Sequence, residues 1–255
     1  MSKLAAEYKF IDLSDYGRPI ARSWAHYLSL TNVTPIHVTL IFGLCGIVAI
    51  FFILSGQFWF AGFFLILKSI IDAVDGELAR IKKTPSFTGR YLDSIFDSIL
   101  NFLFLLAIWF VTDVTFVLMI CAYLAMQLQC SLYNYYYVIL RNATSGSDMT
   151  SKIFELKPPK AFPGENQQKV NILYYIFNIL YILFDKTVQF LDPKAYKSKS
   201  FPSWFMTCIS FYGLGFQLLL MAGMLCIGWI TYIIPFFIGY SGFIILFVLL
   251  RRIIL

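Results

Sequence analysis

Four aspartates lie within 26 residues of a largely apolar stretch of this chain: Asp72, Asp75, Asp93 and Asp97. Carboxylates inside apolar sequence are costly, so a dense cluster of them indicates a functional site. Without compensation they would repel one another and take up protons, whereas divalent cations would offset their charge. Ligands that are all oxygen favour hard ions such as magnesium, manganese or calcium over zinc. A pair of such ions with open coordination positions would also clamp a phosphate group.

Three small residues and an arginine accompany the aspartates: Gly76, Ala79, Gly89 and Arg80. On a helix the first two aspartates share one face with Gly76 and Ala79, and the last two share one face with Gly89. Two antiparallel helices joined by a short linker would turn these faces together. The small residues leave room for a ligand close to the backbone, and Arg80 offers a planar donor for phosphate. The pattern predicts a site for a metal-bound phosphorylated ligand.

The composition is that of a membrane protein. Of the 255 residues, 59% are hydrophobic, whereas roughly 45–50% are apolar in soluble domains. The formal net charge is +6, but the basic residues lie between apolar runs and form no basic face, so nucleic-acid binding is not predicted. Anionic lipid headgroups are the expected neighbours of these residues.

Apolar runs near the ~20 residues that cross a bilayer recur along the chain. They predict an all-α polytopic integral membrane protein with six transmembrane helices and an interfacial amphipathic helix at the N-terminus. Residues 35–255 are expected to form a single membrane domain. The second and third spans each carry two of the aspartates. The expected spans are residues 35–54, 58–80, 89–111, 114–140, 203–227 and 230–250.

Residues 1–34 are expected to form an amphipathic segment on the membrane surface. If this segment is helical, Arg18 and Arg22 are available to lipid phosphates. A merely solvated leader is the alternative. The segment lacks the apolar core of a cleavable signal peptide, so no removal is expected. Five side chains form the apolar face of the predicted helix: Tyr16, Ile20, Trp24, Tyr27 and Leu28.

A long polar insert, residues 141–200, interrupts the apolar pattern and contains one apolar stretch at 170–184. The length of this stretch leaves open whether it crosses the membrane. With six spans, every Lys and Arg except Lys68 lies on the side of the N-terminus, which the positive-inside rule makes cytoplasmic. We therefore expect an interfacial or re-entrant helix at 170–184, with both termini and the active site on the cytoplasmic side.

The inner half of the span 114–140 is unusually polar, with Tyr-Asn-Tyr-Tyr-Tyr at 133–137. These side chains either line a cavity or hydrogen-bond between helices. The sequence does not decide between the two.

The aspartate pattern resembles the full signature of the class I CDP-alcohol phosphotransferase family, also called CDP-alcohol phosphatidyltransferases. All eight fixed positions agree in type and spacing, over about a tenth of the chain. The positions read Asp72-x-x-Asp75-Gly76-x-x-Ala79-Arg80, eight residues, then Gly89-x-x-x-Asp93-x-x-x-Asp97.

The resemblance implies a six-helix membrane enzyme of phospholipid synthesis, usually a homodimer. In this family an acceptor hydroxyl attacks the phosphorus distal to the cytidine of a CDP-linked alcohol, giving a phosphodiester and CMP. Asp72, Asp75 and Asp93 would bind two divalent ions, magnesium or manganese. Asp97 would help hold the second ion and act as general base. Four positions would contact the CDP moiety: Gly76, Ala79, Arg80 and Gly89.

Two further residues are weaker candidates. Before the first span the family commonly shows Pro-Asn, two residues, and Thr or Ser, whereas this chain has Ile36 in place of the amide. Only Thr39 remains there as a candidate nucleotide contact. Lys68 lies one helical turn before Asp72 and either pairs with it or contacts a substrate phosphate.

Two other functions compete with this interpretation. A divalent-cation transporter could use intramembrane carboxylates as a permeation site, although ion passage needs neither the small residues nor the arginine at fixed offsets. A degenerate, non-catalytic family member is disfavoured because all eight positions are present. The expected donor is CDP-diacylglycerol. The sequence leaves open the acceptor alcohol, and also whether the lipid arrives on CDP or as the acceptor.

Overall fold

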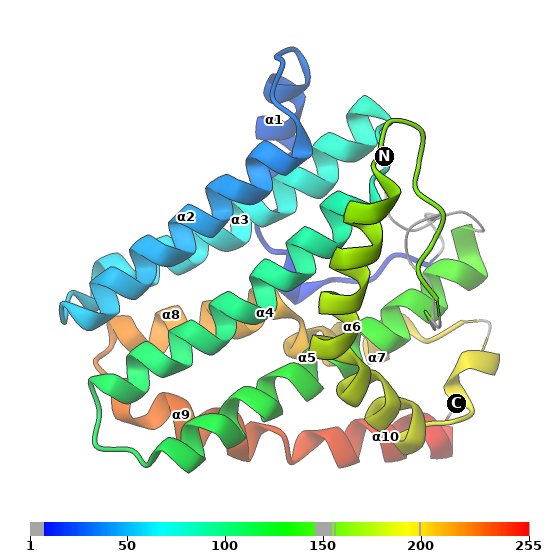
Figure 1. Ribbon diagram of the computed structural model, residues 1–255. Helices are drawn as coiled ribbons and strands as arrows, with labels where there is room; N and C mark the ends of the chain where they lie inside the picture. The colour runs from blue at the N-terminus through cyan, green and yellow to red at the C-terminus, as the bar shows by residue number, and fades with distance from the viewer. Residues whose placement is uncertain (1–7, 146–154, 156, 199, 255) are drawn as a thin grey trace.

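The computed structural model describes residues 8–145, 155, 157–198 and 200–254. Residues 1–7 of the predicted N-terminal segment, 146–154, 156 and 199 of the predicted insert, and the last residue lie outside this part. All regular elements within it are helices (Figure 1). They are η2 (Leu13–Asp15), α1 (Arg18–Ser29), α2 (Pro35–Leu54), α3 (Phe58–Lys82), α4 (Phe87–Phe110), α5 (Phe116–Ser145), α6 (Gln167–Leu191), η3 (Ala195–Lys197), α7 (Ser203–Ile209), η4 (Ser210–Tyr212), α8 (Leu214–Cys226), α9 (Ile230–Tyr240) and α10 (Phe243–Ile254).

The protein is a helical, multi-pass membrane protein. Four segments of the described chain are long and apolar enough to cross a bilayer: α2, α4, α5 and the α9–α10 pair. A fifth is the α7–α8 pair, if these helices, bent by 53°, form one broken span. Helix α3 is long enough, at 25 residues, but its second half carries the charged residues of the aspartate pattern. Composition alone therefore does not qualify it as a span.

The ends of the helices that carry the site follow from local sequence. Thr34 accepts a hydrogen bond from the backbone of His37 and thereby caps α2, with Pro35 at the first helical position. Gly56 has a φ of 71° in the turn before α3, a left-handed conformation that favours glycine. Ser86 accepts a hydrogen bond from the Gly89 amide at 2.8 Å and caps α4. These short connections bring α3 and α4 back against α2.

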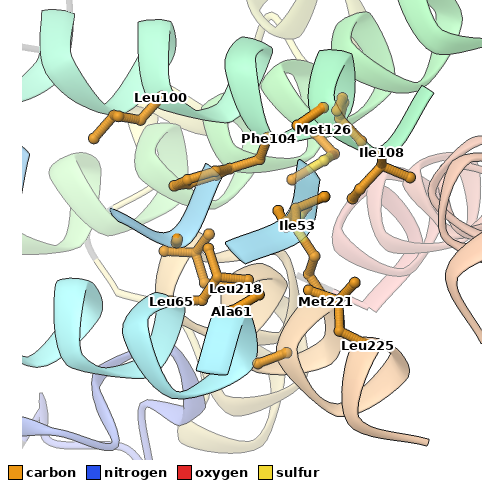
Figure 2. Close-up of a cluster of buried hydrophobic side chains, with 14 of the residues drawn as sticks. Ile53, Ala61, Leu65, Leu100, Phe104, Ile108, Met126, Leu218, Met221 and Leu225 are labelled. Atoms are coloured by element: carbon orange, nitrogen blue, oxygen red, sulfur yellow. The ribbon is translucent and has the colours of Figure 1, made fainter. Parts of the chain in front are cut away.

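Helix α2 packs against both α3 and α4. Its inner face carries small residues such as Gly43 and Gly46, which let α4 approach closely, while Leu44 and Phe51 face outward and are more than half exposed. Large apolar side chains on an outer face are what lipid contact requires. The main core lies among α2, α3, α4, α5 and α8 (Figure 2). It reaches Ile71, Val74 and Leu78 of α3, so the apolar core and the polar cavity residues lie on different faces of the same part of this helix.

The insert is more helical than its sequence suggests. The stretch predicted at 170–184 is the middle of α6, a 25-residue helix that begins at Gln167 and is capped by the side chain of Asn166. Helix α5 continues to Ser145, so the first residues assigned to the insert extend the fourth span. Helix α6 packs against α4 and α5, and Figure 1 shows it crossing them at a steep angle and ending near α10. The insert thus forms one wall of the bundle.

Candidate active site

A cavity of about 420 Å³ opens among α3, α4, α5, α6, α8 and the segment before α1. Its size lies within the ~300–1,000 Å³ range of small-molecule and cofactor sites. The two helix faces that the spacing predicts do converge here. Six of the eight signature residues line the cavity: Asp72, Asp75, Gly76, Arg80, Asp93 and Asp97.

Three aspartates offer one carboxylate oxygen each within 4.8 Å of one another: Asp72, Asp75 and Asp93. The Asp93 Oδ1 atom is buried and has no hydrogen-bond partner. Asp75 is 9% exposed and accepts a 2.8 Å hydrogen bond from the Thr39 hydroxyl. A buried carboxylate oxygen without a partner is costly, and a hard divalent cation among these oxygens would satisfy it. The three residues therefore fit a divalent-ion site.

Thr39 lies near the start of α2, where the sequence places it, and contacts a carboxylate of α3. Its side chain is 1% exposed, and the Thr39 hydroxyl donates to Asp75 Oδ2 at 2.8 Å and lies 3.2 Å from the Pro35 carbonyl oxygen. It is thus a residue that orients a carboxylate of the cluster. A direct contact with a nucleotide stays a prediction.

The fourth aspartate has a different neighbour. The Lys68 ammonium of α3 contacts Asp97 Oδ1 of α4 and lies 3.5 Å from Asp72 Oδ2. The lysine side chain is fully buried. The predicted pairing with Asp72 is therefore present, but the closer partner is on the other helix. The i, i+4 spacing in the sequence indicates the contact of Lys68 with Asp72, whereas the contact with Asp97 is seen only in the folded structure.

Gly76 and Arg80 form a second part of the wall. A Cβ placed on Gly76 would meet only the Arg80 guanidinium, at 3.5 Å, so the glycine faces open cavity. Arg80 lies 3.2 Å from Glu77, whose carboxylate is 1% exposed and also accepts from Arg18 at 2.5 Å. The Arg80 Nε is buried without a partner. Arg80 is thus anchored at one end and can donate to an anion.

Ala79 and Gly89 are not among the cavity-lining residues. The Ala79 carbonyl accepts from the backbone where α3 ends, and Gly89 lies against Ser86, 3.3 Å from where its Cβ would be. Their predicted contacts with CDP remain predictions.

A family model described as CDP-alcohol phosphatidyltransferase matches residues 32–211, well over half of the chain. This range contains α2, the whole aspartate pattern and the three-carboxylate cluster. The chain belongs to this family. The same comparisons find no curated protein and no solved structure that matches the chain.

Membership in the CDP-alcohol phosphatidyltransferase family makes the protein a membrane transferase of phospholipid synthesis, with a CDP-alcohol and a second alcohol as substrates. The family is known for dependence on divalent cations, which agrees with the Asp72, Asp75 and Asp93 cluster. The several apolar helices of the fold agree with an enzyme that works on membrane lipids.

Residues outside the signature complete the cavity. Tyr133, Asn134 and Tyr137 of α5 line the cavity, whereas the Tyr136 hydroxyl donates to the Asp192 carboxylate at 2.8 Å. This polar stretch therefore both lines a cavity and hydrogen-bonds to another segment. Helix α6 adds Tyr181, whose hydroxyl donates to the Ser94 carbonyl at 2.8 Å.

The sequence did not indicate that the segment before α1 forms part of the cavity lining. Asp12 accepts from the Tyr133 hydroxyl at 2.6 Å and lies in the cavity lining with Asp15. Arg18, predicted to be available to lipid phosphates, instead pairs with Asp15 and Glu77. Asp15 is only three residues from Arg18, whereas Glu77 is 59 residues away and lies between signature positions, so no local spacing indicated that second pair.

The insert is tied to the first turn of α4, the helix that carries two of the aspartates. The Glu165 carboxylate accepts from the Ser86 hydroxyl and the Thr88 amide, both at 2.8 Å, and from the Phe87 amide at 3.2 Å. Phe162 stacks on Phe87 with ring centroids 4.7 Å apart. A negative charge at a helix N-terminus is favourable. We call this set of contacts the Glu165 clamp.

The Glu165 clamp predicts a pH-dependent stability. Burial raises the pKa of Glu165, but hydrogen bonds from Thr88 and Ser86 outweigh it and hold the pKa below its ordinary value. Because the pKa of Glu165 is lower in the folded than in the unfolded protein, its carboxylate stabilises the fold at pH values above the unfolded pKa of ~4.3. This stabilisation is lost as the pH falls through the pKa of the folded state. The free energy of unfolding of Glu165→Gln should therefore be about 1 kcal/mol lower than that of the wild type at pH 7. This difference should vanish at low pH.

Thermal unfolding of the purified protein in detergent at several pH values measures this difference. Asp113→Asn is the matched control, because Asp113 is an exposed carboxylate in the α4–α5 connection. Equal unfolding temperatures for wild type and Glu165→Gln at pH 7 would contradict the clamp.

Proposed function

We propose that this protein transfers a phosphatidyl group, or another substituted phosphate group, from a CDP-alcohol to an acceptor hydroxyl. The hydroxyl oxygen bonds to the phosphorus distal to cytidine, the bond from that phosphorus to the bridging oxygen breaks, and CMP leaves with the electron pair. Asp97 takes the hydroxyl proton as general base. The observation that carries this proposal is the convergence of the aspartates in one cavity of a chain that belongs to this family.

The donor-binding residues divide into two groups. Asp72, Asp75 and Asp93 hold divalent cations, magnesium or manganese. When bound, such an ion offsets the charge of the diphosphate and of the transferring group. Arg80 donates to a phosphate oxygen through its unpartnered Nε, and Glu77 holds the guanidinium in place. Gly76, Ala79 and Gly89 complete the set predicted to contact the CDP moiety.

We propose that the chain crosses the membrane six times and that α3 is one of the spans. Composition alone does not identify α3 as a span, but its charged residues line the cavity and therefore need not face lipid. The N-terminal α1 lies on the membrane surface. Support comes from its exposed side chains Ile20, Trp24 and Tyr27, which are 43–72% exposed while its small residues are buried against the bundle.

Helix α6 is proposed to lie at the cytoplasmic interface. Its start is tied to the beginning of α4 through Glu165, and the Asp192 carboxylate just after its end pairs with Arg251 near the end of α10. In a six-span arrangement both of these points lie on the side of the N-terminus, so a crossing helix could not join them. This side is cytoplasmic by the positive-inside rule, and the cavity opens there. The functional unit is proposed to be a homodimer.

CDP-diacylglycerol is the proposed donor, with the acceptor alcohol left to experiment. The purified protein should release CMP from a CDP-alcohol only when magnesium or manganese is present. The rival function, divalent-cation transport, predicts metal flux into vesicles and no CMP. Manganese influx without CMP release from any of CDP-diacylglycerol, CDP-choline or CDP-ethanolamine would reject the transferase and favour the transporter.

A further inference from the structure

We infer that the segment before α1, residues 12–17, is part of the donor site of this chain. Packed into the bundle, it holds Arg80 in place through Arg18 and Glu77, so that the affinity for CDP depends on this packing. The contact of Arg80 with a donor phosphate rests on the proposed function. The packing of the segment does not, because it follows from the contacts of the described residues.

The segment lies in a slot at the start of α8. A Cβ placed on Gly215 would overlap the Ser14 carbonyl oxygen, and one placed on Gly213 would overlap the Ser14 side chain. The Leu13 amide also donates to the Ser210 hydroxyl at 3.0 Å. Glycine at these two positions therefore leaves the room that the segment occupies, and the segment is fixed before α1 begins.

A chain of charged side chains connects the segment with Arg80. Arg18, the first residue of α1, contacts the Asp15 carboxylate through Nε and Glu77 Oε1 through Nη1, the latter at 2.5 Å. The same Glu77 oxygen lies 3.2 Å from Arg80 Nη2. Asp15 and Arg80 line the cavity, whereas Arg18 and Glu77 are not among its lining residues. The two inner groups thus join two walls of the cavity from behind.

This arrangement lets Arg80 serve an anion in the cavity. The Glu77 side chain is 1% exposed, so its charge depends on the guanidinium groups around it. Without Arg18, only Arg80 and the half-exposed Arg22, at 3.6 Å, would compensate this carboxylate. Arg80 would then be drawn toward Glu77 and away from the cavity. Arg18 and Glu77 are therefore positioning residues that act through Arg80, and both lie outside the fixed positions of the signature.

Equilibrium binding of CDP to the full chain in lipid nanodiscs, with manganese present, tests the inference. Arg18→Met should weaken CDP binding by about tenfold, the lower end of the usual cost of losing an outer partner, and leave manganese affinity unchanged. In an Arg80→Met background, Arg18→Met should cause no further loss, because its effect passes through Arg80. Arg22→Met removes the same charge from the next turn of α1, where the side chain is 54% exposed. It should bind CDP within about twofold of the wild type.

Gly215→Ala tests the slot independently of the charges. It should displace the segment and weaken CDP binding, and the double variant with Arg18→Met should show no additional loss. Gly223→Ala is the matched control on the same helix, because a Cβ there would meet nothing within 4 Å. It should bind CDP as the wild type does. If Gly215→Ala does not fold, the arginine variants still decide.

Unchanged CDP affinity in Arg18→Met would overturn the inference, as would an equal loss with and without Arg80. A loss in Arg22→Met as large as that in Arg18→Met would also overturn it, because the charge and not the bridge would then matter. If Arg18→Met does not fold, Arg18→Lys replaces it, since an ammonium keeps the charge but not the forked contact. Non-additive losses of CDP binding without CMP release would reject the transferase alone, while CMP release with additive losses would reject this inference alone.

Discussion

Asp97→Asn is expected to slow CMP release by about 10²–10⁴-fold, the usual contribution of a general base, with little change in CDP affinity. Asparagine keeps the size of the side chain but cannot take the proton of the acceptor hydroxyl. Asp97 lies outside the three-carboxylate cluster, so binding of the divalent ion and of the diphosphate should persist. The turnover rate from CMP release and the dissociation constant for CDP, measured on one preparation, separate the two effects.

The substitution also leaves the buried Lys68 ammonium without its closest anionic partner, which can cost stability as well as activity. The double variant Lys68→Met with Asp97→Asn removes both charges and serves as the control for folding. It should regain the unfolding temperature of the wild type but none of the turnover. Wild-type turnover in Asp97→Asn would contradict the assignment of Asp97 as the base.

Asp75→Asn should weaken the binding of both manganese and CDP by roughly 10²-fold or more. Loss of a residue that only hydrogen-bonds to a metal ligand typically weakens metal binding by about 10–100-fold, and loss of a ligand itself should weaken it further. Asp75 belongs to the three-carboxylate cluster, so the loss of its charge removes a ligand of the ion and, with the ion, the group that offsets the diphosphate. Titration of manganese and of CDP in the presence of manganese measures both constants.

Thr39→Val is the matched variant for this prediction, because it removes only the hydroxyl that donates to Asp75 Oδ2 at 2.8 Å. Its manganese affinity should fall by about 10–100-fold, less than in Asp75→Asn. If Asp75→Asn and Asp97→Asn lost the same amount of CDP affinity, the division between metal ligand and base would be wrong.

The sequence predicted the part of the site whose information is local. The spacing of Asp72, Asp75, Asp93 and Asp97 determines which faces of two helices carry the carboxylates, and the cavity contains all four. The start of the first span at residue 35 was likewise predicted, and Pro35 is the first residue of α2. The helix period and the position of a proline in a first turn depend only on neighbouring residues, which explains why these predictions succeeded.

Contacts between distant segments were not predictable in the same way. Lys68 pairs with Asp72 at helical spacing, but its closer contact with Asp97 depends on how α3 and α4 are both packed against α2. Glu165 reaches α4 from an insert whose sequence reads only as polar. Arg18 was assigned to lipid because its partner Glu77 is a variable position inside the signature. Each contact joins residues whose partners are set by packing and not by periodicity.

The lipid product is the most direct evidence for the central claim that this protein joins a phosphoalcohol from a CDP-alcohol to a second alcohol. The measurement is mass spectrometry of products after the purified chain is incubated with magnesium, CDP-diacylglycerol and a panel of acceptors comprising glycerol phosphate, inositol phosphate, serine and choline. CDP-choline with diacylglycerol tests the reverse arrangement of lipid and headgroup. We predict CMP and one new phosphodiester lipid in equal amounts with at least one pair, and neither product with Asp97→Asn. The absence of CMP and of a new lipid with every pair would contradict the account.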